Sequence, residues 1–269
     1  KVSYGDAVNP SIAIDSLGRI HVVWSEQRPD GTWEVLYSRS ENNGETWSGY
    51  ESGDLLISYD DQKFPDARNM FNPKIVAGVI PGTDKEYDKL HVAWSEYIPE
   101  HPEGAIQEIY YSSSGDAGKT WSGIERNNII SIPSGSGIGE ASEPALSTSG
   151  GEANFVHATW TQQMEQGDFV YYARSVDGGN TWDEESTITP HMPPEMEVSD
   201  ITMAAYLNDV HMTWSQGIRG RADPPGIYYS GSGENGIKGS WTSENENPDW
   251  RTPINDNTGD QNTPITPSI

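Results

Sequence analysis

Hydrophobic and polar residues alternate along this chain in short runs, and the same runs recur four times. In each copy a His-x-x-Trp segment has apolar residues at alternate positions and is followed by Ser or Thr and then by Glu or Gln. A second alternating run, rich in tyrosine, follows after a polar loop. A period of two is typical of a β-strand with one buried face. The pattern therefore predicts strands around residues 21–24, 91–94, 157–160 and 211–214, and around residues 35–37, 109–111, 170–172 and 227–229.

A proline-containing segment opens three of the four copies. It reads Asn-Pro or Glu-Pro with an apolar residue two positions after the proline, and residues 200–203 hold the same place without a proline. Because proline cannot donate to a ladder of hydrogen bonds, it marks the starts and edges of strands. We therefore expect a short first strand directly after the prolines in residues 9–12, 72–75 and 143–146.

A turn motif follows each tyrosine-rich run. It reads Ser-x-Asp/Asn-x-Gly-x-Thr-Trp at residues 40–47, 114–121 and 175–182, and a degenerate copy with two inserted residues spans 232–241. An Asp or Asn side chain can accept from N–H groups of its own turn, and Gly takes a positive φ without steric cost. The tryptophan adds a large apolar anchor. These roles are structural, and we assign them to Asn42, Gly44, Trp47, Asp116, Gly118, Trp121, Asp177, Gly179, Trp182 and Trp241.

A fourth strand is expected after each turn, for example at residues 128–132. Four strands in each repeat of about sixty residues indicate an all-β fold, a β-propeller of four-stranded antiparallel blades. We place the blades at about residues 5–65, 66–138, 139–197 and 198–258 of a single propeller region covering 1–269. Residues 259–269 repeat the Gly-Asp and Pro-Ser-Ile of the N-terminus, so we interpret them as the first strand of a further blade or a closing strand. This favours part of a longer propeller or repeat chain over a closed ring of four blades.

The chain is strongly acidic and contains no cysteine. Its 41 Asp and Glu against 16 Lys and Arg give a formal charge of −25. Such a surface repels nucleic acid and anionic membranes, and no apolar run approaches the roughly 18 residues of a spanning helix. We therefore expect neither nucleic-acid binding nor membrane insertion. The lack of cysteine excludes disulfides and Cys-ligated zinc.

Two features of the sequence could concern metals. The four histidines of the His-x-x-Trp segments could converge on one ion, but their repeated position favours repeated packing. Residues 256–260 resemble part of an oxygen-rich calcium loop, with Asp256 and Asp260 as candidate ligands and without the bidentate Glu of an EF-hand. Calcium is therefore the cofactor that the sequence suggests.

The four turn motifs resemble the Asp-box, or BNR repeat, of the sialidase-like β-propeller superfamily, and the resemblance covers nearly the whole chain. It implies a propeller fold. It does not settle a function, because the same box occurs in sialidases, other glycosidases, sortilin-type receptors and non-enzymatic surface proteins. The resemblance also implies an extracellular or cell-surface location.

The catalytic residues of sialidases are only partly matched. In that family the first blade begins with an Arg-Ile-Pro segment whose arginine grips the substrate carboxylate. Val8 stands at the matching position here, and a valine cannot form such a charge-assisted pair. The family's Glu-x-Arg and the acid/base aspartate that follows it match Glu26-Gln27-Arg28 and Asp30. The resemblance therefore offers Arg28 and Asp30 as candidate catalytic residues.

Three functions remain open. The favoured one is a non-catalytic extracellular or cell-surface module that binds a glycan or protein ligand or builds a surface assembly, since the turn motifs are intact while Val8 interrupts the arginine motif. The second is a sialidase-like glycoside hydrolase using Arg28 and Asp30. The third is a structural repeat that assembles with copies of itself by strand pairing, which the likeness of residues 266–269 to residues 9–12 suggests.

Overall fold

The computed structural model describes residues 3, 5–48, 55–57, 69–78, 88–98, 106–122, 128–132, 138–150, 155–165, 167–189, 195–220 and 226–242. The regular elements in these ranges are β-strands joined by turns. Over the same ranges, no helix has the length and hydrophobicity needed to cross a membrane. The predicted all-β class is confirmed.

The strands form antiparallel blades in chain order, and the chain is a partial β-propeller. The His-x-x-Trp segment is the second strand of each blade and the tyrosine-rich run is the third, as predicted. Three blades show four strands each, and the described part of the fourth shows three. The blades are β1 (Ala7–Ile14), β2 (Ile20–Gln27), β3 (Trp33–Ser40) and β4 (Leu55–Leu56); β5 (Asn69–Gly78), β6 (Lys89–Ile98), β7 (Ile106–Ser114) and β8 (Asn128–Ile129); β9 (Ile138–Ser149), β10 (Phe155–Met164), β11 (Gly167–Ser175) and β12 (Ser186–Thr187); β13 (Met196–Tyr206), β14 (Asp209–Ile218) and β15 (Gly226–Ser232).

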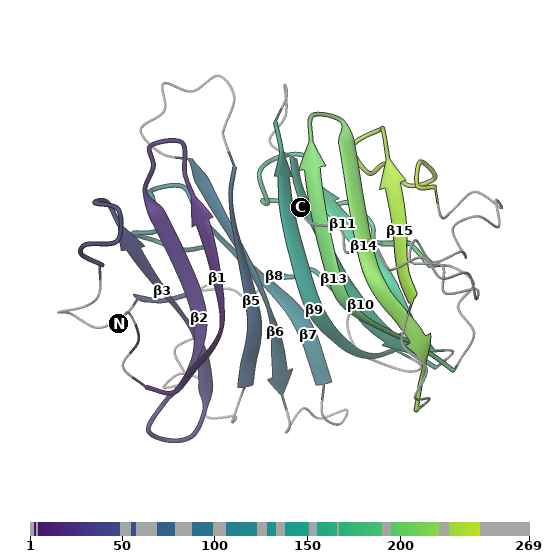
Figure 1. Ribbon diagram of the computed structural model, residues 1–269, viewed down its shortest axis with the longest axis horizontal. Helices are drawn as coiled ribbons and strands as arrows, with labels where there is room; N and C mark the ends of the chain where they lie inside the picture. The colour runs from purple at the N-terminus through teal and green to yellow at the C-terminus, as the bar shows by residue number, and fades with distance from the viewer. Residues whose placement is uncertain are drawn as a thin grey trace, which may run out of the picture.

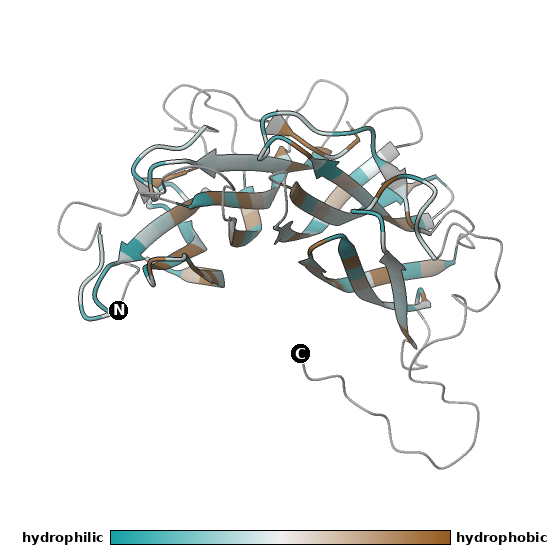
Figure 2. Cartoon of the chain, turned by 90° about the horizontal axis from the view of Figure 1, so that it is seen from above, coloured by the Kyte–Doolittle hydropathy of each residue, from teal (hydrophilic) through white to brown (hydrophobic). Residues whose placement is uncertain are grey.

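The blades stand side by side along an arc (Figures 1 and 2). Their first strands contact one another in sequence, β1 with β5, β5 with β9 and β9 with β13, so these strands form the inner edge of the arc. A single parallel pair, Trp33 with Asn69, also joins the sheets of the first two blades. The arc leaves the first and fourth blades at its two ends.

Each first strand carries a β-bulge at the same place, where its pairing with the second strand shifts. The residues at the bulge have a φ between 52° and 55°, and they are Asn9, Asn72, Glu143 and Asp200. The prolines therefore lie inside the first strands, and our expectation that the strands begin after them was wrong. A bulge removes a residue from the ladder, so the strand continues through a proline that cannot donate.

The second strands explain the Glu or Gln that follows each Trp. Each of these tryptophans is buried, and its indole N–H donates to the carboxylate or amide two residues later. A buried donor is thereby satisfied within its own strand. The donor–acceptor distances are 2.8 Å for Trp24–Glu26, 3.3 Å for Trp94–Glu96, 3.1 Å for Trp160–Gln162 and 3.0 Å for Trp214–Gln216.

The turn motifs are held by their own side chains. In the third blade Asp177 Oδ1 accepts from the backbone N–H groups of Asn180 and Thr181 at 3.0 and 2.9 Å, and Ser175 Oγ accepts from Gly179 N at 2.7 Å. Partial burial alone would raise the pKa of Asp177, but the hydrogen bonds from Thr181, Ser175 and Asn180 outweigh it and lower the pKa to about 2. The carboxylate thus stays ionised and fixes the turn.

A tyrosine of one blade packs into the turn motif of the next. We call Tyr37, Tyr111 and Tyr172, together with the equivalent Tyr229 of the fourth blade, the junction tyrosines. A Cβ built on the motif glycine of the following blade would lie about 2 Å from the tyrosine hydroxyl, at 2.0 Å for Gly118, 1.8 Å for Gly179 and 2.0 Å for Gly236. The motif glycine therefore provides both a positive φ and the space that the neighbour's tyrosine fills. The same rings lie edge-on to the motif tryptophans, with centroid distances of 5.0 Å for Tyr37–Trp121, 5.0 Å for Tyr111–Trp182 and 4.7 Å for Tyr172–Trp241.

The recurrent histidines orient the junction tyrosines. In every blade the histidine Nδ1 lies 2.5–2.7 Å from the tyrosine hydroxyl, and the two rings stack. His21, His91 and His157 are buried in the junctions that follow their blades. The repeated histidine position thus corresponds to repeated packing.

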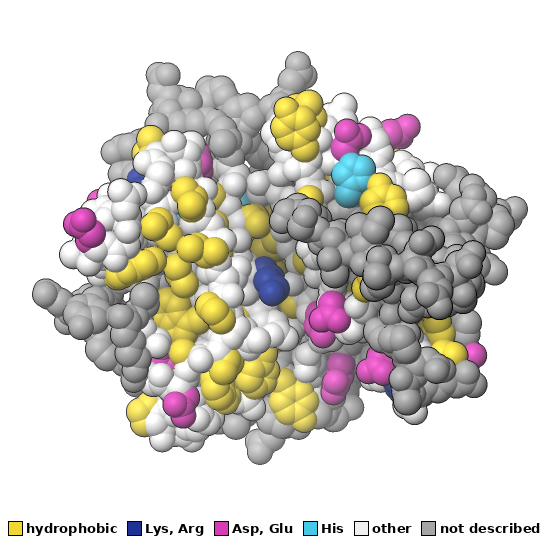
Figure 3. Space-filling model, in the orientation of Figure 1, with side chains coloured by type: hydrophobic (Ala, Val, Ile, Leu, Met, Phe, Trp, Pro, Cys, Tyr) yellow, Lys and Arg dark blue, Asp and Glu magenta, His cyan; other side chains and the backbone are white. Residues whose placement is uncertain are grey.

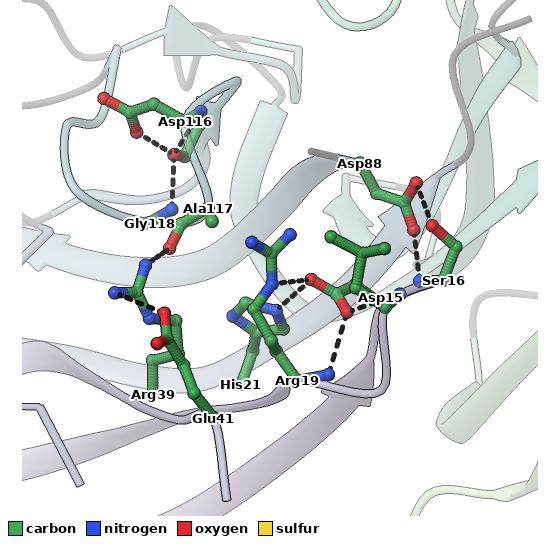
Figure 4. A network of polar contacts seen from close by, with 12 residues as sticks. Asp15, Ser16, Arg19, His21, Arg39, Glu41, Asp88, Asp116, Ala117 and Gly118 are labelled. Atoms are coloured by element: carbon green, nitrogen blue, oxygen red, sulfur yellow. Dashed lines mark hydrogen bonds and ion pairs between the residues drawn. The ribbon is translucent and has the colours of Figure 1, made fainter. Parts of the chain in front are cut away.

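The first junction has further polar contacts, which Figure 4 shows. Arg39 Nη1 donates to the carbonyl of Ala117 at 2.6 Å, and Arg39 also pairs with Glu41. Ser16 donates through N and Oγ to Asp88 at 2.6 and 2.9 Å. Beside them, the buried Asp15 accepts from Arg19 Nε and lies 3.1 Å from His21 Nε2. The Arg39–Ala117 and Ser16–Asp88 contacts join the first two blades outside the apolar core.

Candidate ligand site

A polar cavity lies between the first strands of the second, third and fourth blades. It has a volume of about 180 Å³, and its lining consists of Asn72, Lys74, Glu143, Pro144, Asp200 and Ile201. Three of these, Asn72, Glu143 and Asp200, are the bulge residues with positive φ. The bulges therefore place equivalent residues of three blades around one space, which we call the inner-strand cavity.

Glu143 is the unusual residue at the bulge. Asn and Asp adopt the left-handed conformation more readily than other non-glycine residues, and Glu has no such advantage. Glu143 nevertheless has a φ of 52°, and its Oε2 accepts from the backbone N of Asp200 at 2.8 Å. Backbone strain that local preference does not explain is often found at functional sites.

The electrostatics of the cavity centre on the same carboxyl group. Burial raises the pKa of Glu143, and the negative charges of Asp200 and Glu197 add to this; the hydrogen bond from Asp200 and the charge of Lys74 act in the opposite direction. Figure 3 shows the side of the molecule that carries the first strands, and there a basic side chain lies near the centre with acidic side chains beside it. The cavity thus combines the Lys74 ammonium, an amide and two carboxyl groups.

A second cavity, of about 150 Å³, lies at the junction of the second and third blades. One lining residue is a glycine at a position where other blades carry a larger residue. In the first and third blades the side chains of Asp15 and Ser149 lie within hydrogen-bond distance of the histidine Nε2. The equivalent residue of the second blade is Gly78, which has no side chain to contact His91. Burial and then the charge of Lys89 lower the pKa of His91 to about 3, so the ring that lines this cavity is neutral.

The catalytic candidates from the sequence lie elsewhere. Arg28 pairs closely with Glu34 across the β2–β3 hairpin. Asp30 is exposed in the same hairpin and accepts from Thr32 N and Oγ1 at 3.0 and 2.7 Å, and these hydrogen bonds lower its pKa. Neither Arg28 nor Asp30 lines either cavity. Val8 is partly exposed in β1.

The calcium candidates Asp256 and Asp260 lie outside the described residues, so that prediction stays a prediction. Within the described ranges, no three His, Asp or Glu side chains gather to hold a metal ion.

Sequence reasoning missed Lys74, Glu143 and Asp200 as site residues. The signal available was the bulge position itself, where the blades carry Asn, Asn, Glu and Asp in turn. Because we interpreted those positions as strand starts, their side chains were not expected to converge.

Comparison with solved structures identifies propeller enzymes. A search against protein-family models finds no match, and a search of curated protein sequences finds no significant one. An α-L-arabinofuranosidase of Fusarium graminearum bound to an iminosugar inhibitor aligns with a TM-score of 0.55 and 17% identity over 85% of this chain and 63% of that one. The Hadza microbial sialidase Hz136 aligns with a TM-score of 0.59 and 11% identity over 87% and 45%. An N-acetylgalactosamine deacetylase of F. plautii, in complex with blood group B trisaccharide, aligns with a TM-score of 0.54 and 13% identity over 89% and 71%.

These alignments support the sialidase-like propeller fold. The chain spans 63% of the arabinofuranosidase and 45% of the sialidase, so it matches only part of each.

Proposed function

We propose that this chain is part of an Asp-box propeller, extracellular or on the cell surface, that binds a carbohydrate in the inner-strand cavity without turning it over. The observation that carries the proposal is the set of Lys74, Asn72, Glu143 and Asp200 around one polar space. Sugar hydroxyls both donate and accept, and this set offers ammonium and amide donors together with carboxylate and amide acceptors. The cavity is smaller than the about 300–1,000 Å³ of most small-molecule pockets, which suits one sugar residue of a glycan better than a longer stretch.

Two further points favour binding over turnover. Val8 replaces the carboxylate-gripping arginine that the family resemblance leads us to expect, and Arg28 and Asp30 lie outside the cavity. The pKa of Asp30 is lowered, which is the wrong direction for a general acid near neutral pH. The structural neighbours named above act on carbohydrates according to their names, and this supports the choice of ligand class.

The test begins with a glycan array. Each mono- or oligosaccharide that binds on the array is then titrated into the protein by calorimetry. Lys74→Ala and Asp200→Asn are expected to weaken binding about tenfold or more, because each removes a charged hydrogen-bond partner. Asn, like Asp, tolerates the left-handed conformation of residue 200, so Asp200→Asn is expected to keep the fold. Lys238→Ala and Asp209→Asn, at exposed sites of the fourth blade, serve as matched controls and should bind normally. Undiminished binding in both cavity variants would contradict the proposed site.

Glycoside hydrolysis is the second candidate, favoured by one observation. Glu143, with its raised pKa, and Asp200 are two carboxyl groups in one cavity, and a pair of carboxyl groups is what most glycosidases use. A hydrolase would release product from a bound glycan, and Glu143→Gln would stop that release while leaving binding. The binding proposal predicts instead that the wild-type protein returns every bound glycan unchanged.

A further inference from the structure

We propose that the cavity at the junction of the second and third blades binds a short-chain carboxylate, about the size of propionate, with its carboxylate group between Lys89 and His91. The cavity is enclosed by the two inner blades of the arc, and its lining shares no residue with that of the inner-strand cavity. The proposal therefore does not depend on what the inner-strand cavity binds.

This cavity lies at the end of the strands that carries the turn motifs. Gly78 and Ser149 are the last residues of β5 and β9, and Lys89 and Phe155 are the first residues of β6 and β10. Gly178 of the third turn motif completes this end of the lining. The bulges around the inner-strand cavity lie several residues earlier in the first strands, so the two cavities are at different levels of the blades.

The buried polar group beside the cavity is the imidazole of His91. His91 is 2% exposed, and among the described residues its Nε2 has no hydrogen-bond partner. A Cβ built on Gly78 would lie 3.4 Å from this nitrogen, so Nε2 borders the space in which Asp15 and Ser149 present an oxygen in other blades. A buried polar nitrogen without a partner costs free energy, which a bound ligand would offset.

The contacts of Tyr111 determine where His91 carries its proton. At the first and third junctions the tyrosine hydroxyl lies 3.2 and 3.5 Å from a backbone carbonyl of the next turn motif, but among the described residues no carbonyl accepts from Tyr111. Burial raises the pKa of Tyr111 and a hydrogen bond from Ser113 acts in the opposite direction, which makes Ser113 the donor in that contact. The Tyr111 hydroxyl therefore donates to His91 Nδ1, 2.5 Å away. Because the buried ring is neutral, its one proton is on Nε2, beside the cavity.

Lys89 supplies a second donor to the cavity. Its Nζ donates to Asn180 Oδ1 at 3.3 Å, and this is its only hydrogen bond to a described residue, whereas an ammonium has three N–H groups. Burial lowers the pKa of Lys89, and the charge of Asp177 acts in the opposite direction. The ammonium has thus lost part of its hydration, and an anion beside it would restore a favourable interaction. A carboxylate could accept from both Lys89 and His91, and the bond from Lys89 would be charge-assisted.

The rest of the lining suits a short hydrocarbon chain. Ala77, Phe155 and Val156 contribute apolar side chains, and the Phe155 ring stacks on His157 with 6.0 Å between the centroids. The volume of about 150 Å³ corresponds to about five water molecules at ~30 Å³ each. Propionate has a similar number of non-hydrogen atoms. Its methyl group would contact the apolar side of the cavity while its carboxylate meets the two donors.

Titration of the full chain with sodium propionate, followed by amide NMR at constant ionic strength, tests the proposal. Saturable shifts are expected at the backbone amides of Gly78, Gly150 and Gly178, with a dissociation constant in the millimolar range that so small a ligand allows. Propionamide has the same shape without the charge and should bind about tenfold or more weakly. The absence of saturable shifts, or equal affinity for the acid and the amide, would overturn the proposal.

Two variants locate the ligand. Gly78→Ser gives the second blade the residue that the third blade has at this position, and its side chain would occupy part of the cavity and reach His91 Nε2. Lys89→Met removes the charge and keeps most of the side-chain length. Each should weaken propionate binding about tenfold or more. The matched controls Gly115→Ser, at an exposed glycine with nothing within 4 Å of its Cβ, and Lys238→Met, at an exposed lysine, should bind like wild type. Unchanged affinity in either cavity variant, with a folded amide spectrum, would overturn the proposal.

The proton on His91 gives an independent readout. Nitrogen NMR of the imidazole rings distinguishes an Nε2–H ring from an Nδ1–H ring, and His91→Gln identifies the signal by its loss. The proposal predicts the Nε2–H form, with a ring signal that shifts as propionate is added. An Nδ1–H ring, which would present an acceptor to the cavity, would overturn it.

Discussion

The third and fourth blades present the same pair of side chains to different surroundings. His157 and Tyr172 stack and hydrogen-bond at 2.6 Å inside a closed junction, while His211 and Tyr229 keep nearly the same geometry at 2.7 Å on an open surface. The orientation of the tyrosine is therefore set within a blade, by strand register and the histidine. The neighbouring blade adds burial to an arrangement that already exists.

The same contrast separates Gly179 from Gly44. Both have the left-handed φ of the turn motif, but Tyr111 fills the space beside Gly179 and no described residue of another blade fills the space beside Gly44. Each blade thus carries one half of a contact on either side. Mutations at equivalent positions of filled and open copies therefore measure what the neighbouring blade contributes.

The largest effect is expected from removing a junction tyrosine. Tyr111→Ala should lower the free energy of unfolding by ~3–5 kcal/mol, because it empties a fully buried space between two blades. Tyr229→Ala, measured in dilute solution, should lower it by about 1 kcal/mol or less, since its side chain is partly exposed. Urea unfolding measures both, and equal losses would contradict the distinction between filled and open junctions.

Glycine substitutions give a closely matched pair. Gly179→Ala and Gly44→Ala introduce the same methyl group at nearly the same φ, so both bear a backbone cost of roughly 1–2 kcal/mol. Only at position 179 would the new Cβ also collide with a tyrosine hydroxyl, 1.8 Å away. That overlap should add about 1–3 kcal/mol of destabilisation. Urea unfolding measures the difference in unfolding free energy between the two variants. A difference near zero would show that the Tyr111 side chain moves aside without cost.

The buried histidines predict a loss of stability in acid. Burial is the main cause that lowers the pKa of His91 to about 3 and of His157 to about 4. An unfolded histidine binds a proton near pH 6.5, so the stability that these residues contribute is complete above that pH and declines as the pH falls toward 4. The carboxylate of Asp177 stays ionised to about pH 2 in the fold, and its contribution is lost only below the unfolded value near 4.

This prediction is checked by measuring the free energy of unfolding at several pH values between 6.5 and 4 and taking its slope against pH. His157→Gln should reduce that slope by up to about 1.4 kcal/mol per pH unit, because one titrating group is removed. Val176→Ala should leave the slope unchanged. A slope that persists undiminished in His157→Gln would assign the acid sensitivity to other groups.

The smallest predicted effect concerns the bulges. Asn72→Glu should destabilise the fold by about 1 kcal/mol, because Glu tolerates the left-handed conformation less well than Asn. Asn72→Asp keeps a side chain suited to that conformation and should be nearly neutral. If the two variants were equally stable, the strain that we assign to Glu143 would lack support.

Local pattern was enough to predict most of the strands. The alternation around Trp24, Trp94, Trp160 and Trp214 fixes the second strands, and the following Tyr residues fix the third, because a period of two depends only on near neighbours. The turn motif was equally readable, since its hydrogen bonds run between residues within five positions.

Features that depend on distant residues were not predictable in the same way. The contact of Tyr37 with Gly118 joins residues about eighty positions apart. The sequence around Tyr37 does not indicate that Gly118 is its partner, and the sequence around Gly118 does not indicate Tyr37. The inner-strand cavity depends on three bulges in three blades, and our interpretation of the prolines as strand starts hid it. Arg28 and Asp30 came from a family resemblance, which does not tell whether a hairpin residue faces a cavity.

The most direct test of the junction model is a double-mutant cycle between Tyr111 and Gly179, measured by urea unfolding. If the Tyr111 hydroxyl fills the space beside Gly179, Gly179→Ala should cost less stability in a Tyr111→Ala background than in the wild-type protein, because no hydroxyl then lies 1.8 Å from the new Cβ. An equal cost in both backgrounds would contradict the model.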